Sequence, residues 1–253
     1  MYCTRNVTDS IVWVGGNDRR LALFENLFPI PRGVSYNSYL IMDEKTCLMD
    51  TADASIRQQF IENVLGTLNG RTLDYLVVNH MEPDHCSNIE ELALRFPEMK
   101  IVGNAKTLTF IQQFYQLDLS DRFIAVTEKD TLSLGTHELH FVFAPMVHWP
   151  EVMMCYESSE KILFSADAFG SFGALNGTLF DDEIELDSEW LNDARRYYTN
   201  IVGKFGVQVQ NVLKKAAALD IAVIAPLHGN VWRSKIGFIL EKYNLWSTYT
   251  PEE

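Results

Sequence analysis

The segment NHMEPDHCSN, residues 79–88, contains four potential metal ligands within six residues: His80, Glu82, Asp84 and His85. It follows the apolar run LDYLVV, which is typical of a buried strand. Imidazole and carboxylate together favour iron or manganese over metals that prefer thiolates, although they do not exclude zinc. The segment therefore predicts a metal site at the end of a strand. The alternative is a helix N-terminus with solvated acids and incidental histidines.

Three further potential ligands follow other predicted strands. His148 comes after FVFAPMV, Asp167 after KILFSA and His228 after IAVIAPL. Because open sheets build their sites at the carboxyl ends of strands, we expect these side chains to join the first four. Seven ligands are too many for one tetrahedral ion. They suit two metals, each with two histidines and carboxylates, with Asp167 as a bridge.

The spacing around Pro83 fits this division. His80 and Glu82 are two residues apart, on one side of an extended segment. Pro83 is expected to stop any helix there, so that Asp84 and His85 can turn toward a second metal.

The carboxylates also determine the charge of the predicted site. Glu82, Asp84 and Asp167 carry −3 against +4 for two divalent ions, which leaves room for one hydroxide. With two ferric ions the excess charge rises to +3, and a bound peroxo or oxo group at −2 largely balances it. This balance suits chemistry on oxygen or nitric oxide.

The elements that must position these residues alternate between strands and helices. Two sheets with helices on their outer faces are the architecture that this order favours. For the helix at 87–96, Ser87 to Glu90 fits a capping box. The predicted strands are 38–43, 45–51, 73–80, 99–104, 123–128, 136–145, 152–158, 161–167 and 221–226. The predicted helices are 55–69, 87–96, 106–116, 188–202, a further one to about 218 after Gly203 to Gly206, and 234–243.

Composition restricts the class of protein. Apolar residues make up 47% of the 253 residues, which supports a large core, and the net charge of −13 argues against a nucleic-acid or anionic-membrane partner. No apolar stretch is long enough to span a bilayer, and the N-terminus has no apolar signal core. Four scattered cysteines suggest free thiols in a reducing compartment. We therefore expect a cytoplasmic protein with a single domain over residues 1–253.

Several motifs in order resemble the diiron domain of flavodiiron proteins, within the metallo-β-lactamase superfamily. They are NHMEPDHCSN, VHWPE, FSADAFGSFG, ARRYYTNI and PLHGNVWR, with IVWVGGNDRRLALFENLFPIPRGVSYNSYLI near the N-terminus. The resemblance covers nearly the whole chain and implies an αββα sandwich. It implies a first iron bound by His80, Glu82 and His148, a second bound by Asp84, His85 and His228, and Asp167 as the bridge. In some family members the position of His85 is not coordinated.

Other positions of the resemblance bear on substrate and redox chemistry. Tyr197 and Tyr198 lie in the motif that places a tyrosine near the family's diiron pocket, so one of them is expected to contact the substrate, with core packing as an equal alternative. Trp149 is expected to form a wall of the pocket. Cys86 stands where the family commonly has Ser, and we interpret it as a small residue near a helix cap, with a redox role as the alternative. Hydrolases of the superfamily usually have His at the position of Glu82.

Flavodiiron proteins carry a flavodoxin domain after the sandwich, and this sequence shows no flavodoxin-type phosphate loop before a helix. We therefore expect two iron ions and no FMN in this chain. The missing donor favours a protein that binds O2 as a diferric peroxo-type adduct and acts as an oxygen sensor with a signalling partner. The alternative is an O2 or NO reductase that uses a separate flavoprotein or rubredoxin. A zinc hydrolase is disfavoured by Glu82. The pocket mouth could also support a homodimer.

Overall fold

The larger of two main sheets begins with antiparallel strands and continues with parallel ones. The computed structural model describes residues 2–252. β7 and β8 form an antiparallel hairpin, after which β8, β9, β10 and β11 run parallel and are connected through helices. The seven strands, in spatial order, are β1 (Arg5–Asn6), β2 (Ile11–Trp13), β7 (Tyr39–Met42), β8 (Thr46–Met49), β9 (Tyr75–Val77), β10 (Lys100–Gly103) and β11 (Phe123–Ala125).

The second sheet has five strands. β12 to β15 are antiparallel neighbours and β16 runs parallel to β15, so β13, β15 and β16 point the same way. Their carboxyl ends therefore lie at one edge of this sheet. The strands are β12 (Thr131–Ser133), β13 (Glu138–Phe143), β14 (Met153–Glu157), β15 (Ile162–Phe164) and β16 (Val223–Ala225). Two small sheets pair β3 (Gly16–Asp18) with β6 (Val34–Tyr36) and β4 (Leu23–Phe24) with β5 (Phe28–Pro29).

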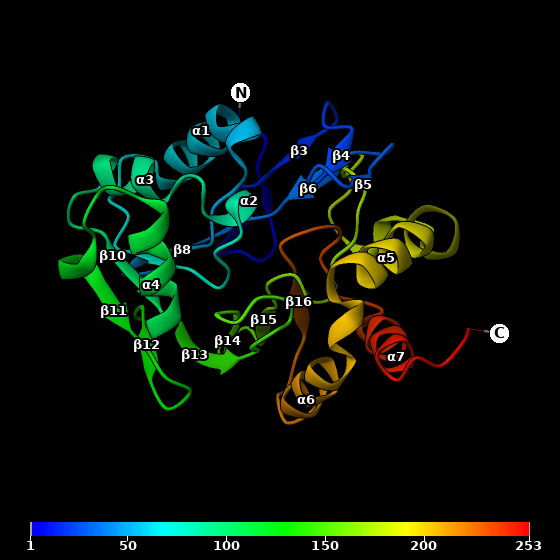
Figure 1. Cartoon of the computed structure of the whole chain (residues 1–253). Coiled ribbons are helices and arrows are strands. Elements are labelled where there is room, and N and C mark those ends of the chain that lie inside the picture. Colours follow the sequence, from blue (N-terminus) through cyan, green and yellow to red (C-terminus); the bar gives the residue numbers. More distant parts are fainter. Residues whose placement is uncertain (1, 253) are drawn as a thin grey trace.

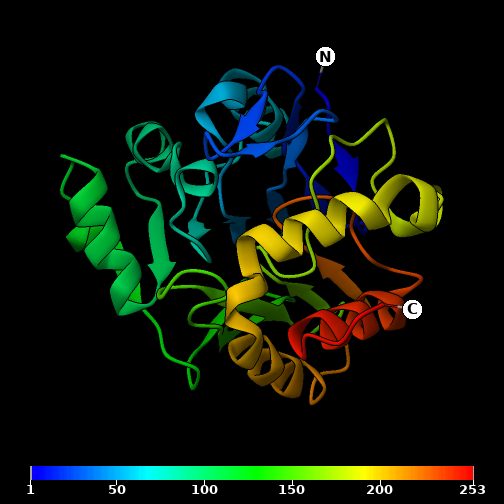
Figure 2. The same ribbon diagram turned by 45° about the vertical axis from the view of Figure 1, so that its right-hand side comes forward.

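The helices cover the outer faces of the two sheets. Figure 1 shows α1, α3 and α4 on the side of the first sheet and α6 and α7 on the side of β15 and β16, and Figure 2 shows the long helical segment around α5 running across the same half. The helices are α1 (Arg57–Leu68), α2 (Pro83–Cys86), α3 (Ile89–Arg95), α4 (Ala105–Phe114), α5 (Leu191–Tyr197), α6 (Gly206–Ala216) and α7 (Ile236–Ser247). This is the predicted αββα arrangement.

Alternate side chains of the strands belong to two different hydrophobic cores. In β7 and β8, Tyr39 and Cys47 belong to the core between the sheets, whereas Leu40 and Leu48 face the helices and pack with Phe60 of α1. Successive strand side chains point to opposite faces, so both faces are apolar only because both are covered.

Two predicted helices differ in detail from the structure. The predicted capping box before α3 is wrong: α3 begins at Ile89, and the Ser87 hydroxyl bonds to the Pro83 carbonyl because Ser87 already ends α2. The predicted helix 188–202 is present, but α5 is flanked by two wide π-helical turns, Leu186–Trp190 and Tyr198–Val202. Among the described residues, none of the helices has the length and apolar content to cross a bilayer.

Candidate metal centre

The structure brings all seven predicted ligands together, and all seven are buried. His80 and Glu82 lie in the extended segment after β9. The other sheet supplies His148, Asp167 and His228 from the segments that follow β13, β15 and β16. Two groups form, and within each group the potential ligand atoms lie within 4.8 Å of one another: His80, Glu82, His148 and Asp167, and Asp84, His85 and His228.

In the first group the atoms converge around His80 and His148. His80 Nε2 lies 3.3 Å from Glu82 Oε2 and 3.3 Å from His148 Nε2. His148 Nε2 lies 3.0 Å from Glu82 Oε2. Two imidazole nitrogens and one carboxylate oxygen thus face the same small space.

The second group is built in the same way around His85 and His228. Their Nε2 atoms are 3.0 Å apart. Asp84 Oδ2 lies 3.4 Å from His85 Nε2 and 3.3 Å from His228 Nε2. The prediction that Pro83 stops a helix here is wrong. Pro83 is instead the first residue of α2, where its missing N–H costs nothing, and the single turn carries Asp84 and His85 into the site.

Asp167 lies between the two groups. Its Oδ2 is 3.0 Å from His148 Nε2 and 3.5 Å from His80 Nε2. Its Oδ1 is 3.1 Å from His85 Nε2 and 3.7 Å from His228 Nε2. One carboxylate therefore presents one oxygen to each group, which is the arrangement that a bridging ligand requires.

The outer nitrogens of two histidines orient the rings. His80 Nδ1 lies 2.7 Å from Glu151 Oε1, and His228 Nδ1 lies 2.7 Å from the Ser35 carbonyl oxygen. Both partners are acceptors, so in the neutral ring Nδ1 carries the proton and the Nε2 lone pair faces the site. This is the orientation that a metal ion needs.

Two carboxylates of the site have oxygens that are free to bind a cation. Neither carboxylate oxygen of Asp84 or Asp167 has a hydrogen-bond partner among the described residues, although both side chains are buried. A buried carboxylate without partners is costly, and a bound cation removes that cost. The donor set of four imidazoles and three carboxylates thus fits two metal ions of intermediate hardness.

The carboxylates control the protonation of the histidines in the metal-free state. Burial alone would lower the pKa of His85, but Asp84 and Asp167 outweigh it and raise this pKa to about 9. Burial would also lower the pKa of His148, but the neighbouring carboxylates of Asp167 and Glu82 outweigh it and raise this pKa to about 9. Protons thus stand in for cations here, and metal binding must displace them.

Comparison with known proteins places the chain in a family. A family model described as "ODP family beta lactamase" matches residues 34–229. The chain belongs to the ODP family. It is 36% identical over 251 residues to the anaerobic nitric oxide reductase flavorubredoxin of Klebsiella pneumoniae, an alignment that covers 98% of this chain and 52% of the relative.

Solved structures of flavodiiron proteins have the same fold as this ODP-family chain. The flavodiiron protein from Giardia intestinalis superimposes with a TM-score of 0.93 at 27% identity, covering 98% of this chain and 60% of that one. The rubredoxin oxygen:oxidoreductase from Desulfovibrio gigas superimposes with a TM-score of 0.92 at 28% identity, covering 98% of this chain and 62% of that one. The resemblance to flavodiiron proteins is confirmed, and the chain spans between half and two thirds of the length of these relatives.

A cavity of about 350 Å³ opens beside the ligands of this ODP-family chain. Trp149 contributes to its wall, as expected, with its ring edge-on to the His80 ring at a centroid distance of 5.3 Å. The cavity is lined by Leu21, Phe24, Glu25, Tyr36, Asp53, Glu82, Pro83, Asp84 and Trp149. Small molecules therefore have access to the carboxylate side of the site.

Two acidic residues near the ligands, Glu25 and Glu151, are not among the predicted site residues. Glu25 sits in the β4–β5 turn with a positive φ of 51°, and the neighbouring Glu82 carboxylate raises the pKa of Glu25 to about 8. Glu151 is fully buried and contacts His80. No local pattern marks Glu25, whereas Glu151 could have been found as an acid in the turn HWPE directly after a ligand.

The two adjacent tyrosines have different neighbours. Tyr197 is fully buried, its ring centroid lies 5.5 Å from that of His228, and its hydroxyl has no hydrogen-bond partner among the described residues. Tyr198 instead packs on Tyr243 and Trp246 of α7. Only Tyr197 is brought next to the ligands, because successive helical residues point in different directions.

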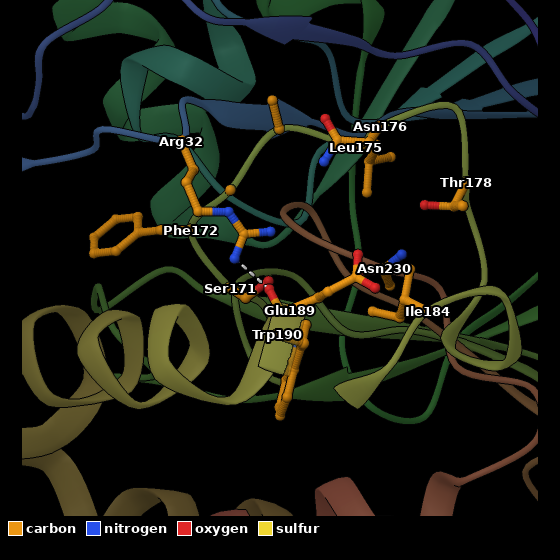
Figure 3. Close-up of a pocket in the computed structure, with 12 residues that line it drawn as sticks. Arg32, Ser171, Phe172, Leu175, Asn176, Thr178, Ile184, Glu189, Trp190 and Asn230 are labelled. Atoms are coloured by element: carbon orange, nitrogen blue, oxygen red, sulfur yellow. Dashed lines mark hydrogen bonds between the residues drawn. The ribbon is translucent and has the colours of Figure 1, made fainter. Parts of the chain in front are cut away.

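A second, smaller cavity is lined mainly by residues 171–178, together with Arg32, Trp190 and Asn230 (Figure 3). Its volume of about 20 Å³ is enough for roughly one water molecule and too small for a substrate. Arg32 enters it, donates to the Glu189 carbonyl and lies 3.3 Å from Asp193 Oδ2.

Cys86 contributes packing beside the site: burial raises the pKa of its thiol to about 12, and its Sγ lies 3.3 Å from the Met81 carbonyl oxygen.

Proposed function

We propose that this chain holds a non-haem diiron centre and reduces nitric oxide or O2 with electrons from a flavoprotein or rubredoxin-type donor. The observation that carries the proposal is the position of Asp167, whose two oxygens face two separate ligand groups. The proposed ligands of the first iron are His80, Glu82 and His148, and those of the second are Asp84, His85 and His228, with Asp167 bridging.

The relatives support a reductase more than a sensor. They include proteins named anaerobic nitric oxide reductase flavorubredoxin and rubredoxin oxygen:oxidoreductase. Glu82 adds a further argument: a carboxylate in the first group makes that group more anionic and favours iron over zinc. Of the three proposed functions, a zinc hydrolase therefore has the least support.

The residues around the ligands have complementary roles in this proposal. A pair of ferrous ions supplies two electrons when bound, one from each ion. Trp149 and Phe24 restrict the size of the substrate through the cavity beside the site. Tyr197 offers an unpartnered hydroxyl near the second group, where it is positioned to donate a hydrogen bond to a substrate oxygen.

The test uses protein loaded with iron and reduced anaerobically, without a donor. Two nitric oxide molecules need two electrons and two protons to give N2O and water, so one loaded chain should produce about one N2O. Complete reduction of O2 to water needs four electrons and should depend on an added flavoprotein or rubredoxin. Metal analysis that gives zinc with no bound iron, or no N2O and no donor-dependent consumption of either gas, would refute the reductase.

Oxygen sensing is the competing proposal, and the same experiment separates the two functions. A visible absorption band that forms with O2 and lasts for minutes in the presence of donor would favour sensing. Loss of the band within milliseconds while reductant is consumed catalytically would favour reduction. The predicted homodimer stays a prediction, and light scattering at micromolar concentration tests it.

A further inference from the structure

Glu151 is a buried carboxylate whose packing does not explain its charge. Its side chain is fully buried, and Oε1 accepts the Met81 N–H at 2.8 Å and faces His80 Nδ1 at 2.7 Å. Oε2 is also buried and has no hydrogen-bond partner among the described residues. A glutamine carbonyl could accept both bonds. Hydrogen bonding alone therefore does not explain why position 151 has a carboxylate and not an amide, because burying an uncompensated charge is costly.

The position of Glu151 suggests that reason. The carboxylate approaches the outer nitrogen of His80, whose inner nitrogen faces the first ligand group. A carboxylate behind a ligand imidazole holds the ring in one tautomer and increases its basicity as a ligand, and a metal cation on the other nitrogen compensates the carboxylate's charge through the ring.

In the second ligand group, no carboxylate of the described residues is hydrogen-bonded to an outer histidine nitrogen. The outer nitrogen of His228 meets the neutral carbonyl of Ser35, and the outer nitrogen of His85 has no hydrogen-bond partner among the described residues. The two groups contain similar inner ligands but differ in what supports them. Glu151 is therefore the feature that distinguishes the first group from the second.

We propose that Glu151 is a positioning residue that strengthens His80 as a ligand and makes the first metal site the tighter of two inequivalent sites. This inference rests on the proposed metal centre but not on the identity of the reaction. Glu151 also connects the two segments that supply the first group, because it follows His148 by three residues and binds the backbone of the segment from His80 to Glu82.

The chain offers a matched control in Glu157, at the other end of β14. Glu157 is also fully buried and lies 3.0 Å from a histidine nitrogen, His137 Nδ1. Its two oxygens accept the backbone N–H groups of Ser159 and Glu160 at 2.8 and 2.7 Å. Neither it nor His137 belongs to the ligand groups, so Glu157→Gln removes a comparable buried charge without touching the site.

The experiment titrates metal-free protein with Co²⁺ against a chromophoric chelator. Wild type should bind two Co²⁺ with different affinities. Glu151→Gln should weaken the tighter affinity about tenfold and leave the weaker one unchanged, since loss of such outer partners costs about 10- to 100-fold. The affinity that falls should be the one that Glu82→Gln also lowers, and Glu157→Gln should change neither. Circular dichroism checks that each variant is folded.

A second readout reports on the ring itself. In Zn²⁺-loaded, ¹⁵N-histidine-labelled wild type, the His80 Nδ1 proton should resonate far downfield and exchange slowly, and Glu151→Gln should move it upfield. A folded Glu151→Gln variant with both affinities and this proton unchanged would overturn the role of Glu151 alone. A wild type that binds no Co²⁺ at the cluster would overturn the metal centre, and the role of Glu151 with it.

Discussion

The two ligand groups use the same residue types but are supported differently. In the first group, His80 is backed by the buried Glu151 carboxylate and covered by Trp149. In the second group, His85 has an outer nitrogen without a hydrogen-bond partner among the described residues. Asp167 presents one oxygen to each group. Similar inner ligands therefore do not imply equal sites, because the outer contacts determine how firmly each ring is held.

The largest expected effect comes from removing the residue that the groups share. Asp167→Ala should lower bound iron from about two ions per chain to less than one, because both groups lose a carboxylate oxygen. Metal analysis after reconstitution measures this. Asp167→Asn keeps the shape and serves as a control for cavity effects. Retention of one full ion in Asp167→Ala would mean that one group does not need the bridge.

Replacing one histidine in each group tests the difference between them. His80→Asn should weaken metal binding more than His85→Asn, since it also leaves the buried Glu151 carboxylate without its partner. We expect a loss of about tenfold or less for His85→Asn and a larger loss, with a lower melting temperature, for His80→Asn. Equal losses in a Co²⁺ titration would show that the outer contact has no influence.

The pH dependence of the metal-free protein should involve both groups. The pKa values of His148 and His85 are raised to about 9, against about 6.5 in an unfolded chain. Their contribution to stability is therefore fully present below about pH 6.5 and is lost as the pH rises through about 9. The melting temperature should fall across this window while metal affinity rises, because fewer protons compete. Calorimetry of the metal-free protein at a series of pH values measures this effect. In the His85→Asn variant the melting temperature should depend less on pH.

The smallest expected effect on stability comes from Tyr197. Tyr197→Phe removes a hydroxyl without a partner, so the free energy of unfolding should change by less than about 1 kcal/mol and metal content should stay the same. If the hydroxyl contacts the substrate, the rate of NO or O2 consumption should fall. Tyr198→Phe should leave that rate unchanged, since Tyr198 packs on α7. Equal rates in both variants and wild type would remove Tyr197 from the proposed site.

The fold followed from local patterns to a large extent. Apolar runs predicted the strands, the order of strands and helices predicted two covered sheets, and the motifs added the αββα arrangement. Local contacts were less predictable at helix ends. Ser87 could cap α3 by its spacing, but it ends α2 in the structure, because Pro83 starts a helix turn just before it.

The sequence by itself determined the types of the seven ligands and their placement after strands, because these depend on spacing along the chain. The spacing also predicted that His80 and Glu82 face one metal and that Asp84 and His85 face the other. Tertiary structure alone decided which oxygen of Asp167 faces which group, that Tyr197 rather than Tyr198 reaches His228, and that Glu151 contacts His80 from 71 positions away. Each of these contacts joins segments that are far apart in the sequence, and their distances depend on how the two sheets and the helices pack.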